Sequence, residues 1–420
     1  MQTKKHNAST MLIWLCWLVY TCSYIGKVNY SANINQIMEF YKVDHSSAGL
    51  VSTLFFFAYG IGQVVNGLLC KKYNLKWIIF ASLTISGIVN LLVGITNNFA
   101  LINALWLING FSMSVLWPCL IRLLAETLSK KDMAKASITM GTTVAVGTFL
   151  VYALSALFVK LNFKLSFYLP SVIFIAVAIV WVLSYNSLTN KASEENTDEI
   201  PTPTLSVTTQ TEKTDKKALM LTICALAIFG IATNLIKDGL TTWVPSILKE
   251  QYSLDSSISI ILTLALPIVA IFGNAFAIRV HKKIPDFALQ CAIIYLTSGI
   301  IIGGVIAGTA LNQFVITIVG FAVVCFLASS CNSLITSIFP LFMKGKVNSG
   351  RIAGILNGFC YVGSTLSSFG LGEIADNHGW EMVFWVLIAV CVLVCVVYGI
   401  YFIIKKSFIK NTPLKSEENA

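Results

Sequence analysis

The chain has 420 residues, of which 56% are hydrophobic and only 11% are charged. An ordinary soluble domain carries about 25% charged residues, so this composition excludes a soluble globular protein. The formal net charge of +10 could indicate a nucleic-acid partner. The positions of the basic residues along the chain argue against one and favour a lipid bilayer.

Apolar runs long enough to cross a hydrocarbon core of about 30 Å as helices recur along the whole chain. We therefore predict an all-α membrane protein. The first run contains Lys27 and is longer than the apolar part of a signal peptide, so we predict a retained span. The twelve predicted spans cover about residues 11–38, 46–69, 77–95, 99–127, 134–158, 166–185, 217–248, 257–280, 287–308, 312–342, 348–375 and 380–404.

The basic residues are distributed unequally between the two sets of loops. If the amino terminus lies inside, 22 of the 29 lysines and arginines fall in inside loops, four fall outside and three lie within spans. This asymmetry is the positive-inside pattern of membrane proteins. It predicts a multi-pass protein of the cell membrane (inner or plasma) with both termini cytoplasmic and no nucleic-acid partner.

One long polar stretch divides the chain. It contains four acidic residues between positions 193 and 200, followed by Pro201, Pro203 and several threonines. A segment of this kind cannot bury enough apolar surface to pack and is typical of a flexible linker. We predict a six-helix bundle over 1–185, a cytoplasmic linker over 186–216, a second six-helix bundle over 217–405 and a cytoplasmic tail over 406–420.

The two halves of the sequence are related. A shift of 210 residues places Lys27 on Lys237 without any gap, and the same shift aligns Ser46-Ser47 with Ser256-Ser257, Thr53-Leu54 with Thr263-Leu264, and Lys72 with Lys282. Repeated halves that share a site near the membrane midplane are common in secondary transporters. We predict two pseudo-symmetric bundles, and a monomer suffices because one chain supplies both.

The lysines at the matched positions carry the functional prediction. A charged side chain in the middle of a span costs at least about 2.5–3.5 kcal/mol on insertion scales, so such a residue is a candidate functional residue. The alternative is a lysine that snorkels to the membrane surface or pairs with a carboxylate. For Lys27 the nearest acid on its span, Glu39, lies about 18 Å along a helix. We expect Lys27 and Lys237 to bind one small anionic substrate.

Several neighbours of the lysines are candidates for lining the same site. Asp238 adjoins Lys237 and has three open roles: it could neutralise the lysine, carry a proton or orient a neighbour. Adjacent helical residues point about 100° apart, so the two side chains need not pair. The other candidates lie within six residues of a lysine: Tyr24, Asn29, Tyr30, Asn33, Asn234 and Trp243.

Two further groups are candidates for coupling or gating. Arg122 and Glu126 stand four residues apart, which suits an ion pair on one helix face, with direct substrate contact as the alternative. The loop after the second span contains Gly67, Lys72 and Lys76. It resembles the loop motif of major facilitator transporters, although ordinary inside positive charge would also explain it.

Other chemistry is not expected. The four histidines, His6, His45, His281 and His378, all fall in predicted loops or tails, the cysteines show no CxxC spacing, and no phosphate-binding GxxxxGK[ST] loop is present. We therefore expect no metal site, no cofactor and no enzymatic activity.

Three local patterns carry a more specific resemblance. They are Lys27-Val28-Asn29-Tyr30 in span one, Asn109-Gly110 with Trp117-Pro118 and Arg122 in span four, and Lys237-Asp238-Gly239 with Trp243-Val244-Pro245 in span seven. The chain resembles the major facilitator superfamily over nearly its whole length. Within that superfamily it is similar to the organophosphate:phosphate antiporters, which include glycerol-3-phosphate and hexose-phosphate transporters.

The resemblance implies that Lys27 and Lys237 stand where the family has phosphate-binding arginines. It also implies alternating access by rocking of the two halves. Lysine replaces a bidentate fork by a point charge, and Val144 or a neighbour stands where the family has a histidine. The expected function is transport of a small organic anion, an organophosphate or a sugar-acid-like carboxylate, by antiport with phosphate. The alternatives are proton-coupled carboxylate symport and a transporter-like ligand sensor.

Overall fold

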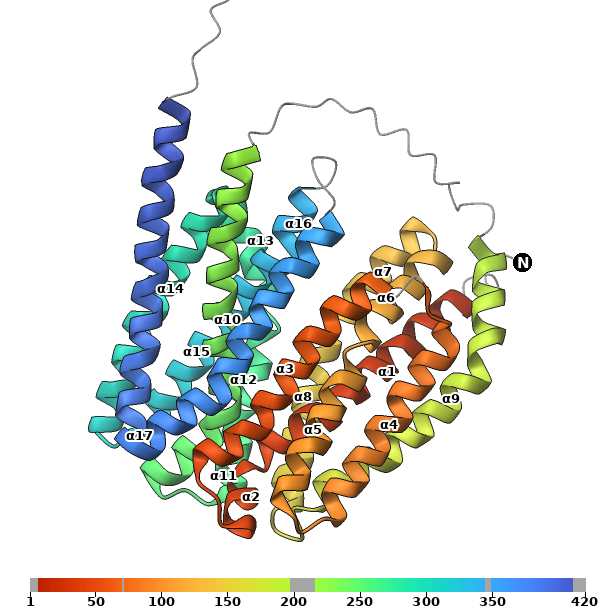
Figure 1. The fold of residues 1–420 in the computed structure, drawn as a ribbon, viewed down its shortest axis with the longest axis horizontal. Coiled ribbons are helices and arrows are strands. Elements are labelled where there is room, and N and C mark those ends of the chain that lie inside the picture. The colour runs from red at the N-terminus through yellow and green to blue at the C-terminus, as the bar shows by residue number, and fades with distance from the viewer. Residues whose placement is uncertain (1–6, 70–71, 197–215, 344–348, 411–420) are drawn as a thin grey trace, which may run out of the picture.

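The computed structural model describes residues 7–69, 72–196, 216–343 and 349–410, and the regular structure within these ranges is helical. Figure 1 shows the arrangement of the helices. The first half of the chain contains α1 (Asn7–Ala32), α2 (Ile34–Tyr41), α3 (His45–Leu69), α4 (Leu75–Ile95), α5 (Phe99–Met113), α6 (Leu116–Thr127), α7 (Lys130–Gly141), α8 (Thr143–Phe158) and α9 (Leu165–Asn196).

The second half repeats this pattern. Its helices begin at nearly the same spacing, because Lys216 corresponds to Asn7, Ser256 to His45 and Phe287 to Leu75. It contains α10 (Lys216–Tyr252), α11 (Ser256–Thr263), α12 (Ala265–Ala270), α13 (Gly273–Lys283), α14 (Phe287–Ala310), α15 (Phe314–Ser333), the π-helical turn η2 (Leu334–Ile338), α16 (Phe339–Phe342) and α17 (Ser349–Lys410).

The described residues contain eleven helical segments that are long and apolar enough to cross a membrane. The last of them, Ile352–Ser407, has 56 residues and is too long for one crossing. It is divided at Gly379, whose φ of 77° and ψ of 172° are not helical and favour glycine. The segment therefore provides two spans, and the predicted twelve-helix, two-bundle fold is confirmed.

Helix α9 extends further than the apolar pattern predicted. It continues to Asn196, through the first residues of the stretch predicted as a linker. The Glu195 carboxylate accepts hydrogen bonds from the backbone N–H groups of Ala8 at 3.1 Å and Ser9 at 3.0 Å. A carboxylate at these unpaired amides stabilises the start of α1. Residues 197–215 of the predicted linker lie outside the described ranges, and the domain boundaries stay predictions.

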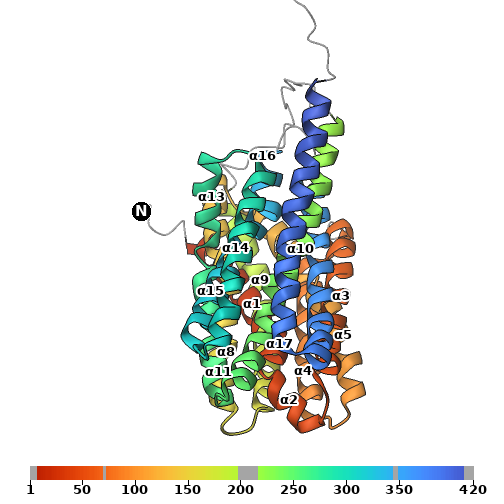
Figure 2. The same ribbon diagram turned by 90° about the vertical axis from the view of Figure 1, so that its left-hand side faces the viewer.

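Two views show how the halves meet. In Figure 1 the helices α1–α9 and α10–α17 form two groups that approach each other near α2, α11 and the bend of α17 and diverge toward α7 and α16. Figure 2 shows the same two ends from the side. We call the end with α2 and α11 the junction end. The end of α9, the start of α10 and the end of α17 all lie at the opposite end.

Packing at the junction end joins α3 to α17 and α8 to α11. The backbones of α3 and α17 come close at Gly49, where a side-chain carbon would overlap the Ser368 carbonyl, so glycine is required for this approach. Polar contacts add to this packing: the Ser246 hydroxyl donates to Asn35 Oδ1 at 2.7 Å, and the Tyr152 hydroxyl donates to the Thr241 carbonyl at 2.5 Å.

Candidate functional site

The ammonium group of Lys27 lies in a cage of aromatic rings. Its Nζ is 4.2 Å from the centre of the Tyr59 ring and 5.0 Å from that of Tyr24. Tyr361 of α17, in the other half, completes the cage at 5.6 Å, with Phe55 and Phe56 of α3 at 5.7 and 5.8 Å. Each such contact contributes about 0.5–2 kcal/mol. The rings thereby stabilise the charge at membrane depth.

The cage leaves the hydrogen-bonding capacity of Lys27 unused. An ammonium group has three N–H donors, and no acceptor for Lys27 Nζ occurs among the residues that the structure describes. Aromatic faces attract the charge but do not replace strong acceptors. The group is thus suited to an anionic ligand that brings its own oxygens.

Lys237 has a different environment, a polar network on α10. Its Nζ lies 3.4 Å from Asp238 Oδ1 and 3.4 Å from Asn234 Oδ1. The Ser364 hydroxyl donates to Asp238 Oδ2 at 2.5 Å, and Asn332 Nδ2 donates to Asn234 Oδ1 at 3.0 Å. Asp238 therefore pairs with the adjacent lysine and is itself held by α17.

The two lysines belong to one electrostatic site. Across the division between the halves, Asp238 attracts and Lys237 repels the Lys27 ammonium. These three side chains carry the charge near the middle of the described spans, and their sum is +1. An unbalanced charge in a poorly solvated site is costly, so the arrangement favours a bound anion.

The structure brings only some of the predicted lining residues to the lysines. Tyr24, Asn234 and Asp238 are there. Asn29 is not, because it is fully buried and donates to Asn90 Oδ1 at 2.8 Å and to the Ser166 carbonyl at 2.9 Å. It lies on the side of α1 that packs against α4 and α9.

Tyr30 and Asn33 are likewise placed inside the first bundle. The Tyr30 hydroxyl donates to the Ala48 carbonyl at 3.0 Å, and its ring packs against Trp106. Asn33 Nδ2 donates to Ser155 Oγ at 2.9 Å. Both side chains join α1 to its neighbours in the fold and do not face Lys27.

Trp243 lies at the junction end. Its Nε1 donates to the Ser368 carbonyl at 3.1 Å, and its ring packs against His45 and Trp380. The expectation that it lines the lysine site is wrong because it sits six residues beyond Lys237, toward the closed end of the molecule.

The candidate gating residues lie at the opposite end. Arg122 Nε donates to Glu126 Oε1 at 2.7 Å, as the spacing predicts, and Arg122 Nη1 reaches the Tyr73 carbonyl at 3.3 Å. The pair thus links α6 to the turn before α4. Gly67 and Lys72 are exposed, and Lys76 Nζ lies 5.5 Å from the Trp77 ring. A gating role for these residues stays a prediction.

The sequence alone did not predict the residues that other helices contribute to the surroundings of Lys27 and Lys237. They are Phe55, Phe56 and Tyr59 of α3, Asn332 of α15, and Tyr361 and Ser364 of α17. Asn332 offered a weak signal as an uncharged polar residue inside an apolar span. The aromatic residues offered none, because the composition is 12% aromatic and only packing selects which rings meet Lys27.

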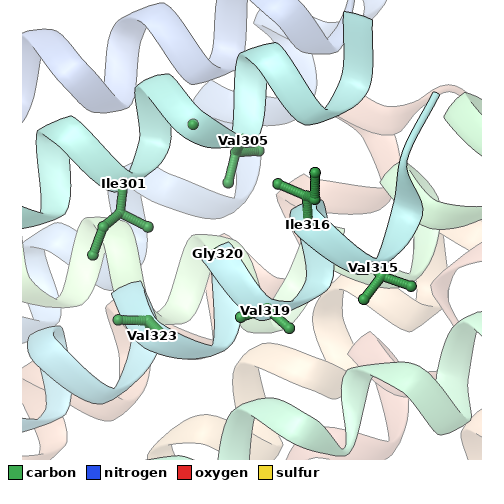
Figure 3. Close-up of a pocket in the computed structure, with 8 residues that line it drawn as sticks. Ile301, Val305, Val315, Ile316, Val319, Gly320 and Val323 are labelled. Atoms are coloured by element: carbon green, nitrogen blue, oxygen red, sulfur yellow. The ribbon is translucent and has the colours of Figure 1, made fainter. Parts of the chain in front are cut away.

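A separate hollow lies between α14 and α15 (Figure 3). It has a volume of about 500 Å³ and is lined by isoleucine, valine and glycine residues, including Ile301, Val305, Ile316 and Gly320. Its walls come from neither of the helices that carry the lysines. An apolar lining suits a hydrocarbon chain and offers nothing to an anion.

Two related helix bundles that share a cationic site between their first helices define a membrane transporter with repeated halves. The profile described as Major Facilitator Superfamily matches residues 16–349. The chain belongs to the major facilitator superfamily, a family of transporters, and is a multi-pass membrane protein.

Similarity to curated proteins is low in identity but extensive. Sugar phosphate exchanger 3 of Bos taurus is 20% identical over 81% of this chain and 76% of its own length. A probable hexose phosphate transport protein of Chlamydia trachomatis is 19% identical over 92% of this chain and 89% of its own. The membrane sensor protein UhpC of Escherichia coli is 28% identical over 28% of this chain and 26% of its own. The resemblance to the organophosphate:phosphate antiporters is confirmed.

Solved structures agree on the fold. A bacterial homologue of the human lysosomal transporter Spinster, in an inward-facing and occupied conformation, has a TM-score of 0.72, with 14% identity over 97% of this chain and 99% of that one. A mutant of the nucleoside transporter NupG has a TM-score of 0.69, with 14% identity over 94% of this chain and 100% of that one.

Proposed function

We propose that the protein moves a small organic anion across the cell membrane as a monomer, by alternating access, with both termini in the cytoplasm. The observation that carries this proposal is the lysine pair, with Lys27 on the first helix of one half and Lys237 on the first helix of the other. Tyr361, from the second half, packs against Lys27, so movement between the halves alters the surroundings of the ammonium group.

The lysine pair gives the substrate a way to drive the transition. Lys27 and Lys237 repel each other in the empty site. An anion bound between them relieves this repulsion and favours conformations in which the halves are close. This difference in affinity is what any ligand-driven conformational change requires.

The contacts at the junction end support an inward-facing state. With the orientation that the basic loops favour, the junction end faces outside and is closed. The end at which α9 finishes and α10 begins faces the cytoplasm, and there the helices diverge (Figure 1).

The names of the relatives support a sugar phosphate or similar organophosphate as substrate, exchanged for phosphate. A carboxylate remains a competing head group, because a lysine binds as a point charge and lacks the bidentate fork of arginine. Asp238 favours a second candidate, proton-coupled carboxylate symport, since a carboxylate beside the ligand could carry the proton. A ligand sensor is a third candidate, and intact uptake with loss of induction in cells would favour it.

Exchange in proteoliposomes tests the proposal. Vesicles loaded with labelled phosphate receive external organophosphates and then sugar acids. We expect one compound to release phosphate. Loss of one charge-assisted contact costs about 1.5–3 kcal/mol, so Lys27→Ala and Lys237→Ala should each slow release roughly 10–100-fold. Lys160→Ala, which removes an exposed lysine, is the matched control and should exchange normally.

Two outcomes would change the conclusion. Normal exchange in both lysine variants would remove the proposed site. Proton uptake driven by a carboxylate, without any phosphate release, would favour symport and keep the lysines as carboxylate ligands.

A further inference from the structure

One histidine connects the two halves at the junction end. The sequence predicted His45 in a loop, but the structure places it as the first residue of α3. Its Nδ1 lies 2.6 Å from Asp376 Oδ1 on α17, and its Nε2 lies 2.7 Å from Glu250 Oε1 on α10. Only 18% of the side chain is exposed. Both carboxylates belong to the other half of the molecule.

These contacts require protons. Ionised carboxylates only accept hydrogen bonds, and a neutral imidazole has a single N–H donor. Bonds from both ring nitrogens to two carboxylates are therefore satisfied by the imidazolium form. Loss of its proton would leave a nitrogen lone pair facing a carboxylate oxygen, with two negative charges beside a neutral ring.

The carboxylates are fixed by further bonds across the junction. Asp376 Oδ1 accepts from the His45 N–H at 3.1 Å, and Asp376 Oδ2 accepts from the Ser46 N–H at 2.7 Å. The carboxylate of one half therefore caps a helix of the other. Glu250 Oε2 accepts from Trp380 Nε1 at 2.8 Å. The His45 ring also packs against Trp243 and Trp380.

The other charged groups nearby are already paired. Asp44 precedes His45, and hydrogen bonds from the side chain and backbone of Ser47 lower its pKa, so it stays ionised. Glu39 of α2 pairs with Lys249 of α10. Apart from Asp376 and Glu250, no titratable side chain forms an ion pair with the His45 ring in the described ranges. The bridging proton therefore belongs to the cluster of His45, Asp376 and Glu250.

We propose that His45, Asp376 and Glu250 form a proton-binding site whose occupancy controls closure of the junction end. With the proton bound, the imidazolium joins α3 to α10 and α17 and the end is closed. Without it, a lone pair of the His45 ring faces a carboxylate oxygen of the other half, so this contact between the halves is lost and the junction loosens. By linkage, a site that binds protons more tightly in the closed state must favour that state when protons are abundant.

This site is separate from Asp238 and gives proton coupling a second location in the molecule. The inference rests on the proposed alternating access but not on the identity of the substrate. It concerns the end that we expect to face outside, so acid on that side would hold the transporter open to the cytoplasm.

Distance measurements between the halves test the proposal without any substrate. Leu161 and Leu311 are 77% and 67% exposed and belong to the loops after α8 and α14, at the junction end of the two halves. A ketone-bearing amino acid at both positions accepts spin labels without involving the native cysteines. The full chain in lipid nanodiscs is then measured by electron-electron double resonance at pH values on either side of the range in which histidine ordinarily titrates.

We expect a short distance at low pH and a growing long-distance population as the pH rises. His45→Gln, which cannot be charged, should show the long distance throughout. His45→Arg, which is always charged, should favour the short distance throughout. His378→Gln is the matched control: this exposed histidine lies at the same end, has no ion pair within the described residues, and should leave the pH response intact.

A distance distribution that does not change with pH in the unmodified protein would overturn the proposal. A pH response that persists in His45→Gln would also do so, as would one that His378→Gln abolishes. Because the measurement needs no transport, a negative result here is distinguishable from failure of the exchange assay.

Discussion

At the scale of single residues, Lys27 and Lys237 stand at equivalent positions of the sequence repeat but have different surroundings. Lys27 is held by aromatic faces and Lys237 by oxygens, with Asp238 3.4 Å away. The aromatic cage leaves the donors of Lys27 open, whereas Asp238 already offsets Lys237. We therefore propose that Lys27 is the primary ligand for an anionic head group and that Asp238 limits how much negative charge the site accepts.

Asp238→Asn should change the charge preference of the transporter. Removal of the carboxylate raises the charge of the empty site by one, which favours a dianion over a monoanion. We expect the ratio of dianion to monoanion transport to rise roughly 10-fold, equivalent to about 1.4 kcal/mol. Competition between a sugar phosphate and the corresponding sugar acid measures it, with Asp238→Glu as the charge-conserving control. An unchanged ratio in Asp238→Asn would contradict this role.

The same variant separates the two possible proton sites. If Asp238 carries a coupled proton, Asp238→Asn should abolish the pH dependence of uptake. If His45 is responsible, uptake by Asp238→Asn should keep its pH dependence while His45→Gln loses it. Initial rates over a pH series in both variants decide between these locations.

At the scale of helices, polar caps define where the spans begin. Asp286 illustrates this at α14, because its Oδ1 accepts from the backbone N–H groups of Ala288 and Leu289 at 2.9 and 3.0 Å. Its other oxygen pairs with Lys405 at 2.9 Å and so ties α14 to the last helix.

Asp286→Ala should destabilise the second bundle by about 1 kcal/mol through loss of the cap. The ion pair adds little, since exposed pairs contribute about 0–1 kcal/mol and these side chains are one third exposed. Thermal unfolding in detergent measures the stability lost with the cap and with the ion pair. Lys405→Ala is the variant that removes the ion pair alone. Equal losses in the two variants would show that the ion pair, and not the cap, matters.

At the scale of the whole molecule, closure at the junction end must alternate with opening if the protein works by alternating access. Glu39 and Lys249 form an ion pair between α2 and α10 across the junction. A link between these positions should trap the present conformation and stop exchange.

Glu39→Cys/Lys249→Cys, joined by a short cleavable thiol cross-linker in proteoliposomes, should lose nearly all exchange and recover it when the linker is cut. The single variants Glu39→Cys and Lys249→Cys, treated in the same way, control for reaction at native cysteines. Normal exchange by the fully linked double variant would rule out opening at this end as a step of transport.

Much of the fold followed from the sequence. Hydrophobic length identified the spans because the bilayer sets their minimum, and the repeat at 210 residues predicted the two halves. The hydrophobic pattern predicted too early an end for α9, because it carries no information on the contact by which Glu195 of α9 caps α1.

The site was only partly predictable. Lys27 and Lys237 were evident because charge is rare at membrane depth. Asn29 was wrongly included although it lies about 200° around α1 from Lys27 at 100° per residue. Tyr24, three residues away, lies within about 60° and does share the lysine face.

By itself, the sequence determined the class of protein, the number of spans and the two central charges, because these depend on composition and local spacing. Tertiary structure decided the partners of those charges. The ring of Tyr361 at Lys27, the hydroxyl of Ser364 at Asp238 and the carboxylates at His45 come from positions more than a hundred residues away in the chain. Such contacts depend on which helix faces meet, and local periodicity does not specify this when both faces are apolar.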